Sequence, residues 1–154
     1  MNLFKRILVP FDGSGASRAG LGRAIALAKN QHARLRLLHV VDENAVIQGM
    51  EPTMNIGDLL DSLVDGGRKL LDEAAATAKR SGAKAETVLY ELHLGRVADR
   101  IVDEAAKWRA DVIVMGTHGR RGIRRLVMGS DAEAVVRMTP VPVLLVKGGV
   151  RKER

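Results

Sequence analysis

The sequence predicts an α/β domain in which helices cover both faces of a doubly wound parallel sheet. Short apolar runs alternate with segments that carry a helical pattern of apolar residues, and this alternation is typical of βαβ units. Residues 111–115, Asp-Val-Ile-Val-Met, are apolar after the first position, as expected of a strand with both faces buried. With 154 residues, the chain has the length of one domain that buries its own core.

Strands and helices are expected to alternate along the whole chain. The strands are expected at about 6–10, 34–41, 84–92, 111–115 and 139–146, and the helices at about 14–30, 57–81, 95–108 and 131–138. Ser14 or Ser17 would begin the first helix, and Ser130 is suited to cap the last one. The weaker apolar alternation of 84–92 indicates an edge strand.

Two segments are expected to be less regular. Residues 43–56 contain Gly49 and Pro52 and predict an irregular loop between the second strand and the long helix. Gly66 and Gly67 lie inside that long helix, where each glycine costs about 1 kcal/mol relative to alanine. The pair is therefore compatible with a kink or a break.

Composition limits the class of protein. The chain has a formal net charge of +7, 46% hydrophobic residues and no cysteine, so it is neither disordered nor held together by disulfides. Its apolar runs are shorter than the about 20 residues of a membrane span, and residues 1–6 leave no room for a signal peptide before the first strand. We therefore expect a cytoplasmic protein without a membrane partner. Aromatic residues make up 3% of the chain, too few for a base-stacking platform, so nucleic acid is not the favoured partner despite the basic charge.

The loop after the fourth strand has the features of a polyphosphate site. Gly116 and Gly119 are separated by two residues, and nine residues later come Gly129 and Ser130. Glycines at a strand exit let backbone N–H groups approach a ligand closely, and the N-terminus of the following helix favours negative charge. Four arginines lie in the spacer, and no acidic residue occurs from 112 to 130; the arginines are Arg120, Arg121, Arg124 and Arg125.

This spacing resembles the nucleotide-binding loop of the ATP-binding branch of the universal stress protein family. Residues 7–14, 37–42 and 139–146 resemble the first, second and last strands of that family, in the same order and at similar separations. The resemblance implies one domain over residues 1–147, followed by a basic tail at 148–154, and an all-parallel sheet of order 3-2-1-4-5. It also implies that ATP binds together with Mg²⁺ carried by its phosphates. The positions that would contact the nucleotide are Pro10, Asp12, Val41, Met115, Gly116, Gly119, Arg120, Gly129 and Ser130.

The implied strand order places the ligand. In an open parallel sheet, ligands bind beyond the carboxyl ends of the strands, where the winding direction changes, which is between strands 1 and 4 in this order. The Asp12-Gly13-Ser14 turn and the 116–130 loop would meet there. Asp12 could bond the ribose or adenine, contact Mg²⁺ from outside, or form an Asx turn with the next two residues. For Val41 the resemblance implies backbone contacts to adenine.

Other motifs do not compete with this interpretation. Residues 13–18 begin like a dinucleotide fingerprint but carry Arg18 in place of the third glycine, and neither a P-loop nor a G-x-S-x-G elbow occurs. The histidines, His32, His39, His93 and His118, lack metal-ligand spacing. His39 is expected to be packed or hydrogen-bonded inside its strand, whereas His118 faces either phosphate or solvent.

The favoured function is an ATP-binding regulatory or stress-response module. A slow ATPase or nucleotidyl transferase is the alternative of another class, but the sequence offers neither an evident catalytic base nor protein ligands for a metal. A basic protein associated with nucleic acid is the third. Asp131, directly after Ser130, suits the helix dipole but could repel phosphate.

The last strand predicts a homodimer. Val143, Leu144, Leu145 and Val146 are apolar on both faces of a strand that the order 3-2-1-4-5 places at the sheet edge. An exposed edge of this kind offers unpaired backbone groups for association, and pairing with the same strand of a second copy would give a self-complementary contact.

Overall fold

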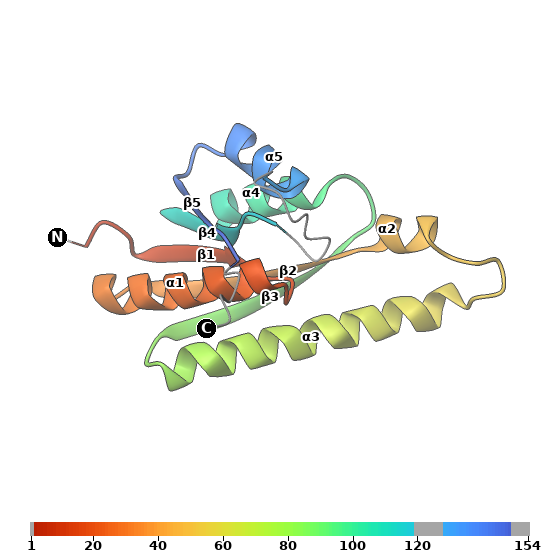
Figure 1. Cartoon of the computed structure of the whole chain (residues 1–154), viewed down its shortest axis with the longest axis horizontal. Coiled ribbons are helices and arrows are strands. Elements are labelled where there is room, and N and C mark those ends of the chain that lie inside the picture. Colours follow the sequence, from red (N-terminus) through yellow and green to blue (C-terminus); the bar gives the residue numbers. More distant parts are fainter. Residues whose placement is uncertain (1, 119–127, 149–154) are drawn as a thin grey trace, which may run out of the picture.

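Five parallel strands form the central layer of the structure, a computed structural model that describes residues 2–118 and 128–148 (Figure 1). The strands are β1 (Arg6–Pro10), β2 (Arg34–Asp42), β3 (Lys84–Leu92), β4 (Val112–Gly116) and β5 (Val143–Val146). Their order is β3-β2-β1-β4-β5, and every pair is parallel. The doubly wound sheet is therefore confirmed, with β1 and β4 adjacent at its centre.

Helices cover both faces of this sheet. They are α1 (Gly15–Gln31), α2 (Glu43–Gln48), α3 (Ile56–Arg80), α4 (Val97–Trp108) and α5 (Ser130–Met138). Figure 1 shows α1 and α3 on one side of the sheet and α4 and α5 on the other. No helix within residues 2–118 and 128–148 is long and apolar enough to cross a membrane.

Strand alternation divides the core between the two faces. Ile7 and Val9 of β1 pack with α1 and α3, whereas Leu8 between them packs with α4 and α5. All three side chains are fully buried. Because successive side chains of a strand point to opposite faces, the continuous apolar run of β1 supplies both halves of the core.

Residues 43–56 are more regular than the sequence predicted, because six of them form α2. The side chain of Asp42 accepts hydrogen bonds from the backbone N–H groups of Asn44 (3.1 Å) and Ala45 (3.3 Å). An aspartate that bonds the first free amides of a helix is a favourable N-cap. The capping residue outweighs the short length of the segment, and Gly49 ends the helix.

The long helix α3 is unbroken through Gly66 and Gly67. A Cβ at position 67 would lie 2.6 Å from Cδ2 of His39, so the missing side chain lets α3 approach β2 closely. His39 Nδ1 lies 2.8 Å from the carbonyl oxygen of Phe11, so the ring is hydrogen-bonded within the fold, as expected. Gly67 thus serves helix-to-sheet packing and does not interrupt the helix.

The two neighbouring glycines give a matched test of this close approach. Gly67→Ala should destabilise the protein by about 1–3 kcal/mol, because the new methyl group forces the bonded His39 ring to move. Gly66→Ala should stabilise it by about 0.5–1 kcal/mol, since no atom of the described residues lies within 4 Å of a Cβ built there and alanine favours the helix. Urea unfolding of both variants measures the difference; equal effects would show that α3 does not pack on His39.

Candidate functional site

The carboxyl ends of β1, β2 and β4 lie at one edge of the sheet, because these strands are parallel neighbours. Pro10 ends β1, Val41 is the penultimate residue of β2, and Met115 and Gly116 end β4. Val41 and Met115 are each 5% exposed, so their side chains belong to the core. Any contact of these two residues with a ligand would therefore have to use their backbone groups.

The turn after β1 joins the strand to α1. Oδ1 of Asp12 accepts a hydrogen bond from the backbone N–H of Ser14 (2.9 Å), and Gly13 adopts a φ of +80°. Oγ of Ser14 caps α1 by accepting from the N–H of Ser17 (3.1 Å). Asp12 therefore forms the Asx turn that was one of its expected roles, while its carboxylate stays at the end of β1.

Ser14 also links this turn to the loop after β4. Its hydroxyl lies 3.5 Å from the carbonyl oxygen of His118, a residue 104 positions further along the chain. The two turns that the sequence predicted to meet are thus in direct contact.

The exit of β4 is closed by backbone contacts. A Cβ at Gly116 would lie 2.7 Å from the carbonyl carbon of Ala16 in α1, so this glycine is required by packing against the helix. Thr117 donates from its N–H to the carbonyl oxygen of Val146 (3.0 Å), and its own carbonyl accepts from the N–H of Gly129 (2.6 Å). The chain therefore leaves β4 and returns to the same point before α5 begins.

Thr117 stands out chemically at this point. The residue is 8% exposed, and its hydroxyl has no hydrogen-bond partner among the described residues. Buried hydroxyl groups normally find a partner. Strand alternation puts position 117 on the same face as Ile113 and Met115, which pack with α5.

The start of α5 differs from the sequence prediction. Gly129 is the N-cap, Ser130 is the first helical residue, and no side chain of the described residues caps the helix. The reason is that Gly129 is held against Thr117: a Cβ there would lie 2.9 Å from the Thr117 carbonyl oxygen. The exposed Ser130 hydroxyl is therefore not used for capping, and Gly129 is constrained by the loop itself.

Several predicted site residues fall outside the described part of the chain. These are Gly119 and Arg120, together with the other spacer arginines, Arg121, Arg124 and Arg125. Residues 149–154 of the expected basic tail also lie outside it.

Three aspartates, Asp12, Asp42 and Asp131, lie near these strand ends, and the sequence did not predict that they influence one another. Desolvation raises the pKa of Asp131 at the start of α5, and the negative charges of Asp42 and Asp12 raise it further. Asp131 is exposed as a residue, but the surroundings of its carboxyl group are crowded enough to disfavour its charge. The sequence contains one indication of this proximity: Asp42 stands at the carboxyl end of the second strand, and Asp12 stands just after the first.

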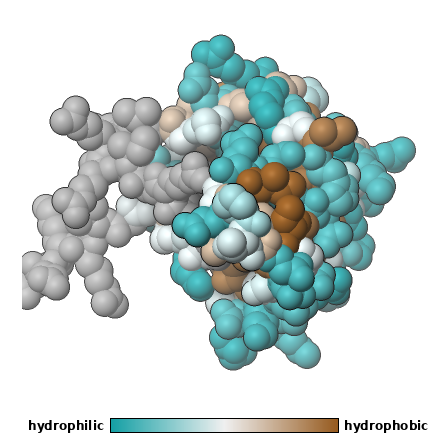
Figure 2. Space-filling view, turned by 90° about the vertical axis from the view of Figure 1, so that its right-hand side faces the viewer, coloured by the Kyte–Doolittle hydropathy of each residue, from teal (hydrophilic) through white to brown (hydrophobic). Residues whose placement is uncertain are grey.

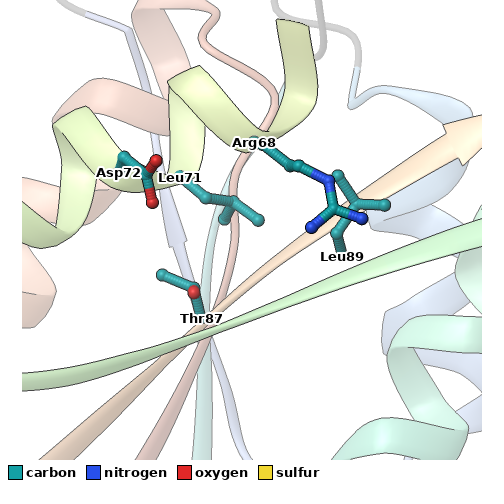
Figure 3. A pocket seen from close by; sticks show the side chains of 5 residues that line it. All are labelled: Arg68, Leu71, Asp72, Thr87 and Leu89. Carbon is teal, nitrogen blue, oxygen red and sulfur yellow. The ribbon is translucent and has the colours of Figure 1, made fainter. Parts of the chain in front are cut away.

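A separate cavity lies between α3 and β3 (Figure 3). It has a volume of about 280 Å³, and its lining residues are Arg68, Leu71, Asp72, Thr87 and Leu89. Figure 3 shows these side chains facing one another across the space between helix and strand. None of them belongs to the predicted site, so the cavity plays no part in it.

The sequence is similar to a known protein family. The sequence model of the universal stress protein family matches residues 3–147. A universal stress protein of Methanocaldococcus jannaschii is 37% identical over 147 residues, which cover 95% of this chain and 84% of the relative.

Solved structures share the fold. The crystal structure of a universal stress protein family member from Burkholderia pseudomallei is 33% identical, covers 95% of this chain and 98% of its own, and superposes with a TM-score of 0.77. A universal stress protein solved in complex with cAMP is 24% identical, with a TM-score of 0.67, and covers 95% of this chain and 98% of its own. The latter likeness shows the fold alone.

The raised pKa of Asp131 predicts how its replacement changes stability with pH. A carboxyl group whose pKa is raised in the folded state contributes no penalty below its ordinary pKa of 3.8, and it destabilises the fold increasingly as pH rises through the raised value. Asp131→Asn should therefore gain stability relative to the native protein between pH 3.5 and pH 7.

Thermal unfolding across that pH range measures the difference. Asp61→Asn removes an exposed carboxylate of α3 and is the control for the general effect of losing one negative charge. If the helix dipole dominated instead, the Asp131→Asn variant would lose relative stability as pH rises.

Proposed function

The chain belongs to the universal stress protein family, and on that premise we propose that it is a cytoplasmic ATP-binding module with a regulatory or stress-response role. The observation that carries the proposal is the closed exit of β4. There the Thr117–Gly129 hydrogen bond holds the start of α5 beside the turn after β1.

The start of α5 supports a phosphate site. The first amides of a helix have no intrahelical partner and attract anions, and among residues 2–118 and 128–148 no side chain caps α5 and occupies them. The exposed hydroxyl of Ser130 adds a donor at the same place. The spacer arginines follow Gly119 in the sequence and would supply the positive charge that a triphosphate requires.

The nucleoside would lie against the ends of β1 and β2. Asp12 keeps a carboxylate there while its Oδ1 holds the turn, and a carboxylate can accept from ribose hydroxyls. Backbone groups of Val41 would meet the adenine edge, as the family resemblance implies.

A divalent cation would accompany the phosphates. Mg²⁺ prefers hard oxygen ligands, and the triphosphate itself would supply them. Burial raises the pKa of Asp131, and the negative charges of Asp42 and Asp12 raise it further. A cation carried by the phosphates would therefore reduce the repulsion between these carboxylates and the triphosphate.

Ser130→Ala tests the phosphate site without disturbing the fold. Because Ser130 makes no capping bond, stability should remain within about 0.5 kcal/mol of native. Loss of one hydrogen bond to phosphate should weaken binding of ATP with Mg²⁺ by about 1 kcal/mol, roughly fivefold. Titration calorimetry measures both proteins.

Ser81→Ala at the end of α3 is the matched control and should bind ATP like the native protein. Unchanged affinity in Ser130→Ala would remove the hydroxyl from the site. Failure of the native protein to bind ATP would overturn the proposed function itself.

We further propose a homodimer through β5. This strand pairs only with β4 in the sheet of the described residues, so its other edge has no backbone partner there. Leu144 is 44% exposed, whereas Val143 and Leu145 pack partly against the core. Joining two such edges would continue the sheet and cover Leu144.

Leu144→Lys should weaken the dimer, because it places a charge at the centre of the contact. Sedimentation velocity at micromolar concentration should show a dimer for the native protein and mainly monomer for this variant. Leu94→Lys replaces a leucine that is 82% exposed elsewhere and should leave the dimer intact. A monomeric native protein at high concentration would contradict the proposal.

A further inference from the structure

A cluster of three potential metal ligands lies at the outer edge of the sheet, away from β4 and α5. Glu43 is the first residue of α2, Glu91 is in β3, and His93 follows β3. One ligand atom from each lies within 4.8 Å of the other two. Within residues 2–118 and 128–148, this is the one such group of histidine and carboxylate side chains.

The fold brings the three residues together through strand register. β2 and β3 pair with Val41 opposite Glu91 and Asp42 opposite Leu92, so the chain continues with Glu43 beside His93. Glu91 and His93 are two residues apart and point to the same face, opposite the buried Leu92. His93 Nδ1 lies 2.5 Å from Oε2 of Glu43.

The cluster has one closed side and one open side. The side chain of Glu43 is 13% exposed, whereas that of His93 is 71% exposed, and Glu91 is also exposed. Glu43 is thus the fixed member, and the other two can rotate toward it. Figure 2 views this end of the molecule and shows a few apolar side chains on a largely hydrophilic surface. The exposed apolar residues of this region include Ile47 of α2, Met54 after it and Ile56 of α3.

The two carboxylates of this cluster have no lysine or arginine partner. In the described part of the chain, neither Glu43 nor Glu91 forms an ion pair with lysine or arginine, and the one pair within the cluster joins Glu43 to His93. This contrasts with Glu86 and Glu104, which share the guanidinium of Arg36. Two close carboxylates that have no lysine or arginine partner favour a cation between them.

We propose that Glu43, Glu91 and His93 form a site for a divalent transition-metal ion of the Zn²⁺ type. One imidazole nitrogen and two carboxylate oxygens are ligands that Zn²⁺ accepts, and three protein ligands leave a position for water. The imidazole favours such an ion over Mg²⁺ or Ca²⁺, which prefer oxygen ligands throughout. A bound ion would tie the end of β3 to the start of α2.

Small side-chain movements would complete the coordination. Bonds of about 2.0–2.1 Å in a tetrahedral site separate the ligands by about 3.4 Å. The atoms of Glu91 and His93 would therefore close in on the ion, and the hydrogen bond between His93 and Glu43 would be replaced by two bonds to it. The exposed positions of Glu91 and His93 allow this without repacking the core.

Titration calorimetry with zinc chloride tests the site in the full-length, chelator-stripped protein. The buffer is free of phosphate and nucleotide and contains millimolar Mg²⁺, so that sites made of carboxylates alone are occupied. The native protein should bind about one equivalent of Zn²⁺. His93→Ala and Glu91→Gln should each lose at least about tenfold in affinity, since changes even outside the ligand shell cost this much.

Two matched variants control for non-specific effects. Glu73→Gln removes an exposed carboxylate from α3, and His32→Asn removes an exposed histidine whose φ of 51° asparagine tolerates; both should bind Zn²⁺ like the native protein. Circular dichroism verifies that all four variants fold. Absence of saturable binding in this Mg²⁺-containing buffer, or binding that persists in His93→Ala and Glu91→Gln, would overturn the proposal. Because nucleotide is absent, none of these outcomes bears on ATP binding.

Discussion

The first turn of α1 packs directly on the backbone of β4, and the rest of the site depends on this contact. Position 116 must be glycine because a Cβ there would meet Ala16 at 2.7–2.8 Å and Ser17 N at 2.9 Å. Gly20 faces the same backbone one helical turn later, and a Cβ at Gly148 would lie 3.2 Å from the backbone nitrogen of Ala16. Small residues on both sides thus let a helix start where two strands end.

This contact places the polar groups of two distant segments together. Because α1 starts against β4, its cap Ser14 reaches the carbonyl oxygen of His118. On the other side of β4, the hydrogen bond between Gly129 and Thr117 sets where α5 begins. The amides at the start of α5 and the carboxylate of Asp12 therefore face a common region, although more than 100 residues separate the two segments.

Opposite charges at one strand edge have a physical logic. Helix amides attract an anion, whereas burial and the negative charges of Asp42 and Asp12 raise the pKa of Asp131 and so disfavour its charged form. A phosphate group alone would bind the amides but would be repelled by the carboxylates. A phosphate that carries its own cation would bind the amides with less repulsion, so the arrangement favours a metal-bound polyphosphate over a free one.

The strands could be predicted from the sequence because each is an apolar run of sufficient length. β1 and β3 begin and end where the pattern indicates, because Pro10 and the glycines that follow these strands are local signals that a strand ends. The sequence did not predict α2 because six residues give too little periodicity, although Asp42 is a residue type that favours the N-cap position. Gly67 was misinterpreted because its reason, the His39 ring, lies in another strand.

The site could be predicted less completely than the fold. Glycine spacing indicated the loop, but the sequence does not reveal that Gly129 closes on Thr117 and so displaces Ser130 from the cap position. Long-range proximity is the common difficulty. Asp131 senses Asp42 across 89 positions, and His93 meets Glu43 across 50; both contacts exist only once the strand order is known.

Asp42 and Glu43 show how one strand end can serve two sites. Adjacent residues leaving a strand point to opposite faces of the sheet. Asp42 shares the face of Leu38, which packs with α4 and α5, and its charge reaches Asp131. Glu43 points the other way and contacts His93. Both belong to the start of α2, which Asp42 caps. An ion held by Glu43 would therefore act on the same first turn of α2 that Asp42 caps.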